Sequence, residues 1–391
     1  MRWGSACAIS ALGCLCALVA SDAPMAAEWS GDASASLRQE YNDNILMTAG
    51  PHNPVLGNTA SSWFTMKMLD DLFQMKATAL LEYTAYIGES GLNTTNYDLV
   101  LSPVYTTGRA TWKLDGEMKQ DVTLGSELKE TGVVLTRDQR RLLSASPSWS
   151  WSFTERTSVQ LQYQFMDVRY PGSNPGLVDY EAQLVTMTGS LSATERDTMT
   201  ASLQYIDYRA SSIGLQSQDY GAQIGIKHAF SETVSGELSG GADHNVTNFG
   251  AGALFTTNRE WGWLLNGSLQ QQSEVMLLTG GVSQQILPSG GGYLVQTQHL
   301  SGLVRRELFQ PLTAFVSADA YWTSALGIKS VPDSQYYTVS TGLSWRLKEH
   351  WTLDATYRYG RSDYQHAPQA IESNAVYWRI AYNSPDKIFS P

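Results

Sequence analysis

Long runs of alternating apolar and polar residues constrain this chain more than any other feature. Between residues 73 and 87 the odd positions are apolar or aromatic and most even positions are polar, and the alternation recurs over residues 159–165, 337–347 and 351–359. A period of two is that of a β-strand with one apolar face. Strands of soluble sheets typically have about five or six residues, whereas these runs approach the length of membrane-crossing strands. The pattern therefore favours an all-β protein that crosses a membrane.

Short polar breaks divide the alternating runs at a regular spacing. Glu155, Glu195, Glu232, Glu274, Pro311 and Glu349 mark breaks that recur every 37 to 42 residues. Each interval fits one strand, one loop and one returning strand. The same step taken backwards from Glu155 predicts further turns at Asp115-Gly116 and near Asp70-Asp71. Eight turns between nine hairpins predict a closed antiparallel barrel of about 18 strands, with 16 as the alternative count.

The other ends of the hairpins carry longer segments rich in Gly, Pro, Asn and Ser. Short periplasmic turns and longer extracellular loops are typical of outer-membrane barrels. The long candidates for a loop that folds inward and narrows a pore are residues 42–60, 124–138 and 245–259, and a further loop is predicted over residues 280–292. Aromatic residues beside the short turns predict an interfacial girdle, which comprises Phe73, Trp112, Trp151, Phe153, Phe230, Trp345 and Trp351.

The N-terminus and the composition agree with a bacterial outer-membrane protein. Residues 1–27 read as a cleaved signal peptide, with Arg2 before a short apolar core and small residues near position 27. The three cysteines lie within this segment, so residues 28–391, predicted to form one barrel domain, contain no thiol. Only 16 % of the residues are charged and the net charge is −11, which argues against nucleic-acid binding.

One motif-like stretch lies in the first predicted strand and the loop after it. Its residues are Arg38, Glu40, Tyr41, Asn42, Asp43, Asn44 and Ile45. This stretch resembles the opening strand of the outer-membrane β-barrel porin-like family associated with bacterial exopolysaccharide export loci. The resemblance implies an 18-stranded barrel that takes part in polysaccharide synthesis or secretion, with a periplasmic export component as a partner.

The inward face of the predicted strands is polar and slightly basic. The pore-lining candidates are Arg38, Glu40, Lys76, Glu82, Arg140, Lys227, Arg305, Arg346, Asp354, Arg358 and Arg379. A barrel of this size encloses water, and a basic lining raises the local concentration of anions. Alternatively, Arg38 with Glu40 and Asp354 with Arg358 form ion pairs that only brace the wall.

We therefore expect a pore for carbohydrate, either an exopolysaccharide or an anionic sugar, that contacts membrane lipid and needs no cofactor. A general diffusion porin and a surface adhesin are alternatives, and the oligomeric state is open. No pair of histidines has metal-ligand spacing, so no metal site is predicted. An enzyme is not expected. An outer-membrane hydrolase built on His228 and Ser231 is the weaker alternative, because a catalytic serine also needs an orienting third group.

Overall fold

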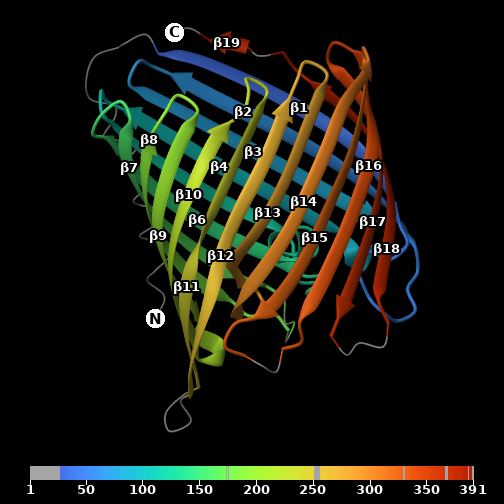
Figure 1. The fold of residues 1–391 in the computed structure, drawn as a ribbon. Helices are drawn as coiled ribbons and strands as arrows, with labels where there is room; N and C mark the ends of the chain where they lie inside the picture. The colour runs from blue at the N-terminus through green and yellow to red at the C-terminus, as the bar shows by residue number, and fades with distance from the viewer. Residues whose placement is uncertain are drawn as a thin grey trace.

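The chain forms a closed antiparallel β-barrel of 18 long strands, as the alternation and the turn spacing predicted (Figure 1). The computed structural model describes residues 27–172, 174, 176–250, 256–328, 331–365, 369–385 and 387–389. The first half of the barrel comprises β1 (Glu28–Asn42), β2 (Val55–Leu69), β3 (Phe73–Tyr86), β4 (Thr94–Thr106), β5 (Ala110–Val122), β6 (Gln139–Ser152), β7 (Thr157–Arg169), β8 (Tyr180–Ser192) and β9 (Asp197–Ala210). The second half comprises β10 (Leu215–Ala229), β11 (Val234–Phe249), β12 (Thr256–Gln272), β13 (Met276–Ser289), β14 (Tyr293–Phe309), β15 (Leu312–Ala325), β16 (Ser334–Lys348), β17 (Trp351–Tyr364) and β18 (Ile371–Asn383).

The barrel closes between its first and last long strands. β1 pairs with β2 on one side and with β18 on the other, in the register Arg38 opposite Arg379. A short strand, β19 (Lys387–Phe389), continues along the start of β1 and pairs with Trp29–Gly31. The predicted signal segment lies outside the described residues, apart from Ala27. None of the described helices is long and apolar enough to cross a membrane.

The two ends of the barrel differ as expected, but two predicted boundaries were wrong. Asp115 and Gly116 lie inside β5, and the turn before β5 is at residues 107–109, where the Thr107 amide donates to the Ala110 carbonyl over 2.7 Å. The fixed spacing failed because the long loop between β5 and β6 lengthens that hairpin. The loop predicted over residues 280–292 is mostly β13, since Gly280 and Gly281 pair with β14.

The outward faces of the strands carry the residues that contact lipid. Apolar side chains such as Leu37, Leu203, Ile224 and Leu300 are exposed all around the barrel. The predicted girdle beside the short turns is present, with Trp112, Phe153, Phe230, Trp345 and Trp351 exposed. A second group of exposed aromatics, which was not predicted, lies near the loop end and includes Tyr41, Tyr83, Tyr220 and Trp261. Aromatic belts at both ends of an apolar band are typical of outer-membrane barrels.

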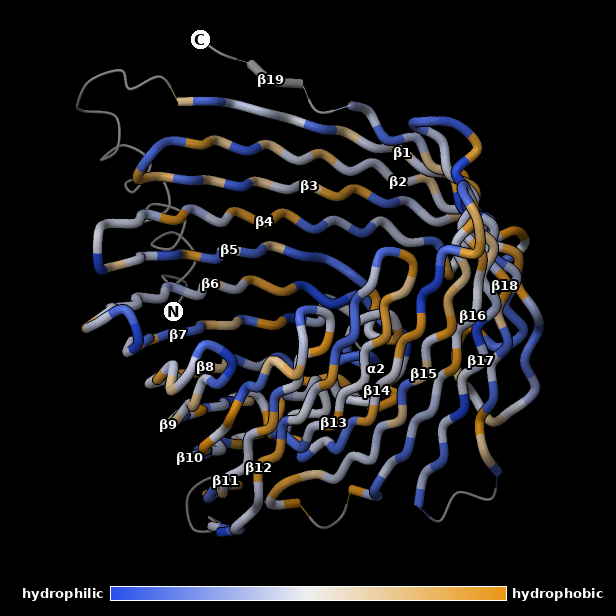
Figure 2. Tube along the Cα trace, turned by 45° about the horizontal axis from the view of Figure 1, so that its top comes forward, coloured by the Kyte–Doolittle hydropathy of each residue, from blue (hydrophilic) through white to orange (hydrophobic). Residues whose placement is uncertain are grey.

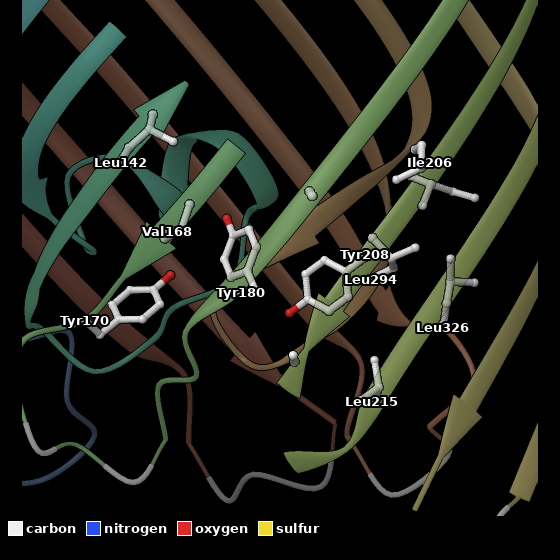
Figure 3. Close-up of a cluster of buried hydrophobic side chains, with 12 residues drawn as sticks. Leu142, Val168, Tyr170, Tyr180, Ile206, Tyr208, Leu215, Leu294 and Leu326 are labelled. Carbon is white, nitrogen blue, oxygen red and sulfur yellow. The ribbon is translucent and has the colours of Figure 1, made fainter. Parts of the chain in front are cut away.

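Part of the interior is filled by the hairpin of β13 and β14, whose tip bends inward. Leu294 and Val295 are neighbours in β14 and point to opposite faces, yet only 0 % and 1 % of their surfaces are exposed. Both faces of this tip are therefore covered by protein. The Tyr208 hydroxyl of β9 donates to the Ser289 carbonyl over 2.9 Å. Figure 3 shows the apolar cluster around the tip, where Leu294 lies with Tyr180, Tyr208, Leu215 and Leu326.

Candidate functional site

The loop between β5 and β6 folds into the barrel, as one of the three candidate loops was expected to do. It carries a short helix, α2 (Glu127–Thr131), which Figure 2 shows inside the ring of strands. Two side-chain hydroxyls, those of Thr297 on β14 and Thr323 on β15, donate to the Thr131 carbonyl over 3.1 and 2.6 Å. The Tyr321 hydroxyl donates to the Lys129 carbonyl over 2.9 Å. The loop thus crosses the lumen and is anchored on the opposite wall.

Ion pairs of Arg140 and a hydrogen bond from Tyr170 hold α2 near the loop ends of β5, β6 and β7. Arg140 on β6 contacts Asp121 and Glu130 at 3.1 and 2.9 Å, and only 1 % of its side-chain surface is exposed. The buried Glu127 carboxylate accepts a hydrogen bond from the Tyr170 hydroxyl. Burial raises the pKa of Glu127 to about 7, because the Tyr170 hydrogen bond and the charge of Arg140 only partly offset the loss of hydration.

An elongated cavity of about 1130 Å³ remains beside α2, against the walls formed by β1, β3–β5 and β14–β18. Its lining reaches from Met47, in the loop after β1, to Thr313, near the turn end of β15. The inward loop and the inward hairpin tip leave this space on one side of the lumen. The cavity is the candidate path for a solute.

The charges that line the cavity are unevenly distributed between its two sides. Glu82, Asp98 and Asp121 come from β3, β4 and β5, and Glu130 comes from α2. Arg358, Arg379 and Arg38 come from the adjacent strands β17, β18 and β1. Lys119, Lys129 and Arg137 lie with the acidic residues, and Glu40 and Asp354 lie with the arginines. Each side therefore has only a small excess of one sign, and we call the two sides the acidic wall and the basic wall. Such an imbalance creates a field across the path.

Two arginines of the basic wall hold no carboxylate partner. The guanidinium groups of Arg38 and Arg358 lie 5.6 and 5.2 Å from the centre of the Tyr377 ring. Arg38 donates to the Thr59 hydroxyl over 3.3 Å, while its Nε is buried without an acceptor among the described residues. No described carboxylate lies within 4.0 Å of either guanidinium. These cations pack against an aromatic ring, and no described carboxylate forms an ion pair with them.

The two ion pairs predicted to brace the wall, Arg38 with Glu40 and Asp354 with Arg358, are not formed. Asp354 pairs with Arg379 over 2.7 Å, not with Arg358. The carboxylate of Glu40 accepts a hydrogen bond from the Asn42 amide over 3.2 Å, not from Arg38. Bracing therefore involves Asp354 and Arg379 and leaves the sites of Arg38 and Arg358 open.

Lys129 of α2 is a lining residue that was not predicted. Lys129 lines the cavity, and enclosure in the barrel followed by the charges of Arg358, Arg38 and Lys119 lowers its pKa. Lys129 therefore adds a cation from α2 to the cavity. Its only sequence signal was its place in a loop expected to fold inward.

The structure distributes the predicted pore-lining residues over two regions. The cavity is lined by Arg38, Glu40, Glu82, Arg305, Asp354, Arg358 and Arg379. Arg140 lies beside the cavity and holds α2. Lys76, Lys227 and Arg346 are exposed near the turn end, on the inward face by strand parity, and do not line this cavity.

The residues of the hydrolase alternative do not meet. His228 contacts the Asp197 carboxylate over 2.6 Å. The Ser231 hydroxyl accepts from the Val234 amide over 3.1 Å and lies 3.3 Å from the Thr233 hydroxyl. The Ser231 hydroxyl thus stabilises its own turn. Within the part of the chain that the structure describes, no group of three or more His, Cys, Asp or Glu residues is arranged to hold a metal ion.

The closed 18-stranded wall, the lipid-facing apolar band and the inward-folded loop define a porin-type barrel of the bacterial outer membrane. Among solved structures, the outer membrane protein OpdK of Pseudomonas aeruginosa is similar, with a TM-score of 0.47, 9 % identity, and coverage of 91 % of this chain and 99 % of OpdK.

Two further solved structures are similar to a comparable extent. OccK2 (OpdF) of Pseudomonas aeruginosa in complex with glucuronate has a TM-score of 0.47 and 10 % identity, over 90 % of this chain and 97 % of that protein. OccAB4 of Acinetobacter baumannii has a TM-score of 0.45 and 9 % identity, over 93 % and 99 %. No protein-family model and no curated protein matches the chain.

Proposed function

We propose that this barrel is an outer-membrane pore for a small anionic solute, of the kind represented by an anionic sugar. The observation that carries the proposal is the position of Arg38 and Arg358, whose guanidinium groups flank Tyr377 without a carboxylate partner. Arginine binds carboxylates through paired hydrogen bonds and keeps its charge at any physiological pH. Lys129 adds a third cation from α2 on the same path.

The remaining lining supports a solute that carries hydroxyl groups as well as a negative charge. Asn96 and Gln120 line the cavity with Glu82 and Asp98, opposite the basic wall. Amides and carboxylates accept hydrogen bonds from hydroxyl groups. An anionic sugar would place its carboxylate on the arginines and its hydroxyls on this wall.

Passage of an exopolysaccharide, which the family resemblance implies, makes a different demand on the same lumen. A polymer needs a continuous path, whereas α2 and the tip of the β13–β14 hairpin occupy much of the interior. The anchors on Thr131, Lys129 and Glu130 favour a fixed constriction and thus a small solute.

Swelling of proteoliposomes tests the proposal with a uronate and the neutral hexose of the same size. We expect faster swelling in the uronate, and we expect Arg38→Gln with Arg358→Gln to remove that preference while hexose entry persists. Arg346→Gln is the matched control, because Arg346 lies near the turn end outside the cavity. Equal rates for both sugars in the unmodified protein would reject the anionic solute, and loss of polymer export on gene deletion without a change in uronate uptake would favour the polymer.

A further inference from the structure

The wall of the barrel separates between β12 and β13 in its loop-side half. These strands pair only from Leu265 opposite Gln284 to Gln272 opposite Leu277. On the other side of β12, pairing with β11 extends to Thr256, and β13 pairs with β14 up to Ser289. Among the described strands, the segment of β12 from residue 256 to 264 therefore has no partner toward β13. The inward bend of the β13–β14 tip is the cause.

A groove of about 200 Å³ lies where the two strands separate. Leu265, Gln284, Gln298 and Trp322 stand opposite one another across four strands and so share one face of the sheet. That face is the outer one, because Tyr321, the neighbour of Trp322, points inward to α2. The groove therefore opens toward lipid, within the band of exposed apolar residues. Its apolar lining is Trp263, Leu265, Val282, Leu300 and Trp322, and its polar lining is Ser283, Gln284, Gln298 and His299, of which Ser283 and His299 belong to the inward face.

Glutamine side chains satisfy the backbone where the strands separate. The Gln284 side-chain amide donates to the Trp263 carbonyl over 2.7 Å and accepts from the Gln298 amide over 2.8 Å. Only 2 % of Gln284 is exposed. In a bilayer, an unsatisfied backbone group costs several kcal/mol, so this relay stabilises the end of the β12–β13 pairing by satisfying the Trp263 carbonyl. What remains open to lipid there is mainly apolar surface.

The lining of the groove changes from amphipathic to aliphatic residues along the barrel axis. Trp263, Trp322 and the exposed Gln298 lie toward the loop end, whereas Val282 and Leu300 lie one step closer to the turn end. Tryptophan and amide groups suit the interface between headgroups and chains, and aliphatic residues suit the hydrocarbon. This order matches an amphiphile in the outer leaflet, with its polar end near the loops.

We propose that the groove at the β12–β13 separation binds one alkyl chain of an outer-leaflet amphiphile. The site is continuous with the lipid-facing band, which identifies hydrocarbon as the occupant. It is distinct from the anion path, which lies inside the barrel against β1, β3–β5 and β14–β18.

Photolabelling tests this proposal in phosphatidylcholine vesicles that contain the whole barrel and a fatty acid with a diazirine at the end of its chain. We expect the peptides that contain Trp263, Val282 and Leu300 to take up several-fold more label than the rest of the apolar band. Val282→Trp fills the groove and should reduce this labelling to the level of the band. Val316→Trp is the matched control, because Val316 is an exposed valine of β15 that does not line the groove.

The distribution of label over the peptides of the unmodified protein tests the proposal without any variant. Uniform labelling around the band would overturn it, as would labelling of the groove that Val282→Trp leaves unchanged in a folded barrel. Concentration-dependent dimers that protect the same peptides would also overturn it, because the groove would then be a contact between two copies of the chain.

Discussion

The guanidinium of Arg140 donates hydrogen bonds of 2.9 and 3.1 Å to the carboxylate of Glu130 and ties α2 to β6. The same guanidinium donates two hydrogen bonds of 3.1 Å to Asp121 at the end of β5. One buried arginine thus joins the strands on both sides of the inward loop to the helix that the loop carries. The width of the cavity depends on this junction, because α2 forms part of its lining.

Removal of this junction should loosen the constriction. Arg140→Ala removes the cation that joins Asp121 to Glu130. The cost is smaller than for a fully buried pair, because Asp121 keeps Lys119 at 3.6 Å and about half of the Glu130 side chain is exposed. We expect larger and noisier single-channel currents in planar bilayers. Arg169→Ala is the control, since Arg169 also bonds two carboxylates, Asp167 and Glu181, but is exposed beside the loops. Currents unchanged by Arg140→Ala would show that the other anchors suffice to hold α2.

The anchor at Glu127 predicts a dependence on pH. When α2 is anchored, burial raises the pKa of the Glu127 carboxyl from the ordinary 4.5 to about 7. Glu127 therefore binds a proton more tightly when α2 is anchored than when α2 is released. The anchored state is therefore favoured below about pH 4.5 and loses that advantage as the pH rises to about 7. The charges that face Glu127 are Arg140, Glu130 and Asp121.

Current noise recorded between pH 4.5 and 8 measures this effect. We expect the noise to increase toward pH 7 and then to level off, and Glu127→Gln to remove the increase. Glu181→Gln should retain it, because Glu181 is an exposed carboxylate of β8. A pH dependence that survives in Glu127→Gln would assign the effect to another group.

The end of α2 depends on Gly132. This residue has a φ of +73°, and a Cβ there would lie 2.3 Å from the Cβ of Tyr321. The left-handed conformation alone costs an L-residue about 1–2 kcal/mol, so Gly132→Ala should push α2 away from β15. We expect a lower melting temperature and altered conductance. Gly108→Ala, in a short turn with open space around it, should change neither.

Most of the barrel could be predicted from the sequence because each strand contributes its own alternation. The turn at residues 107–109 was missed for a local reason, since the loop with α2 lengthens that hairpin. The inward tip of β13 and β14 does carry a sequence signal. Ile286 and Leu287, like Leu294 and Val295, are apolar on both faces, which is typical of a strand covered on both sides.

The site was less accessible to prediction than the wall. Strand parity places Arg38 and Arg358 on the inward face, but it does not reveal that Tyr377 lies between them. Nor does it reveal that Asp354 pairs with Arg379. Lys129 lies in a loop without periodicity, so only the path of that loop across the lumen brings it to the cavity.

The reversal potential of single channels in a salt gradient tests the central claim most directly. We predict anion preference for the unmodified protein, and a shift toward cations in Arg38→Gln with Arg358→Gln, because the cavity then retains its acidic wall. A reversal potential that already indicates cation preference, or one that the double variant leaves unchanged, would contradict the account.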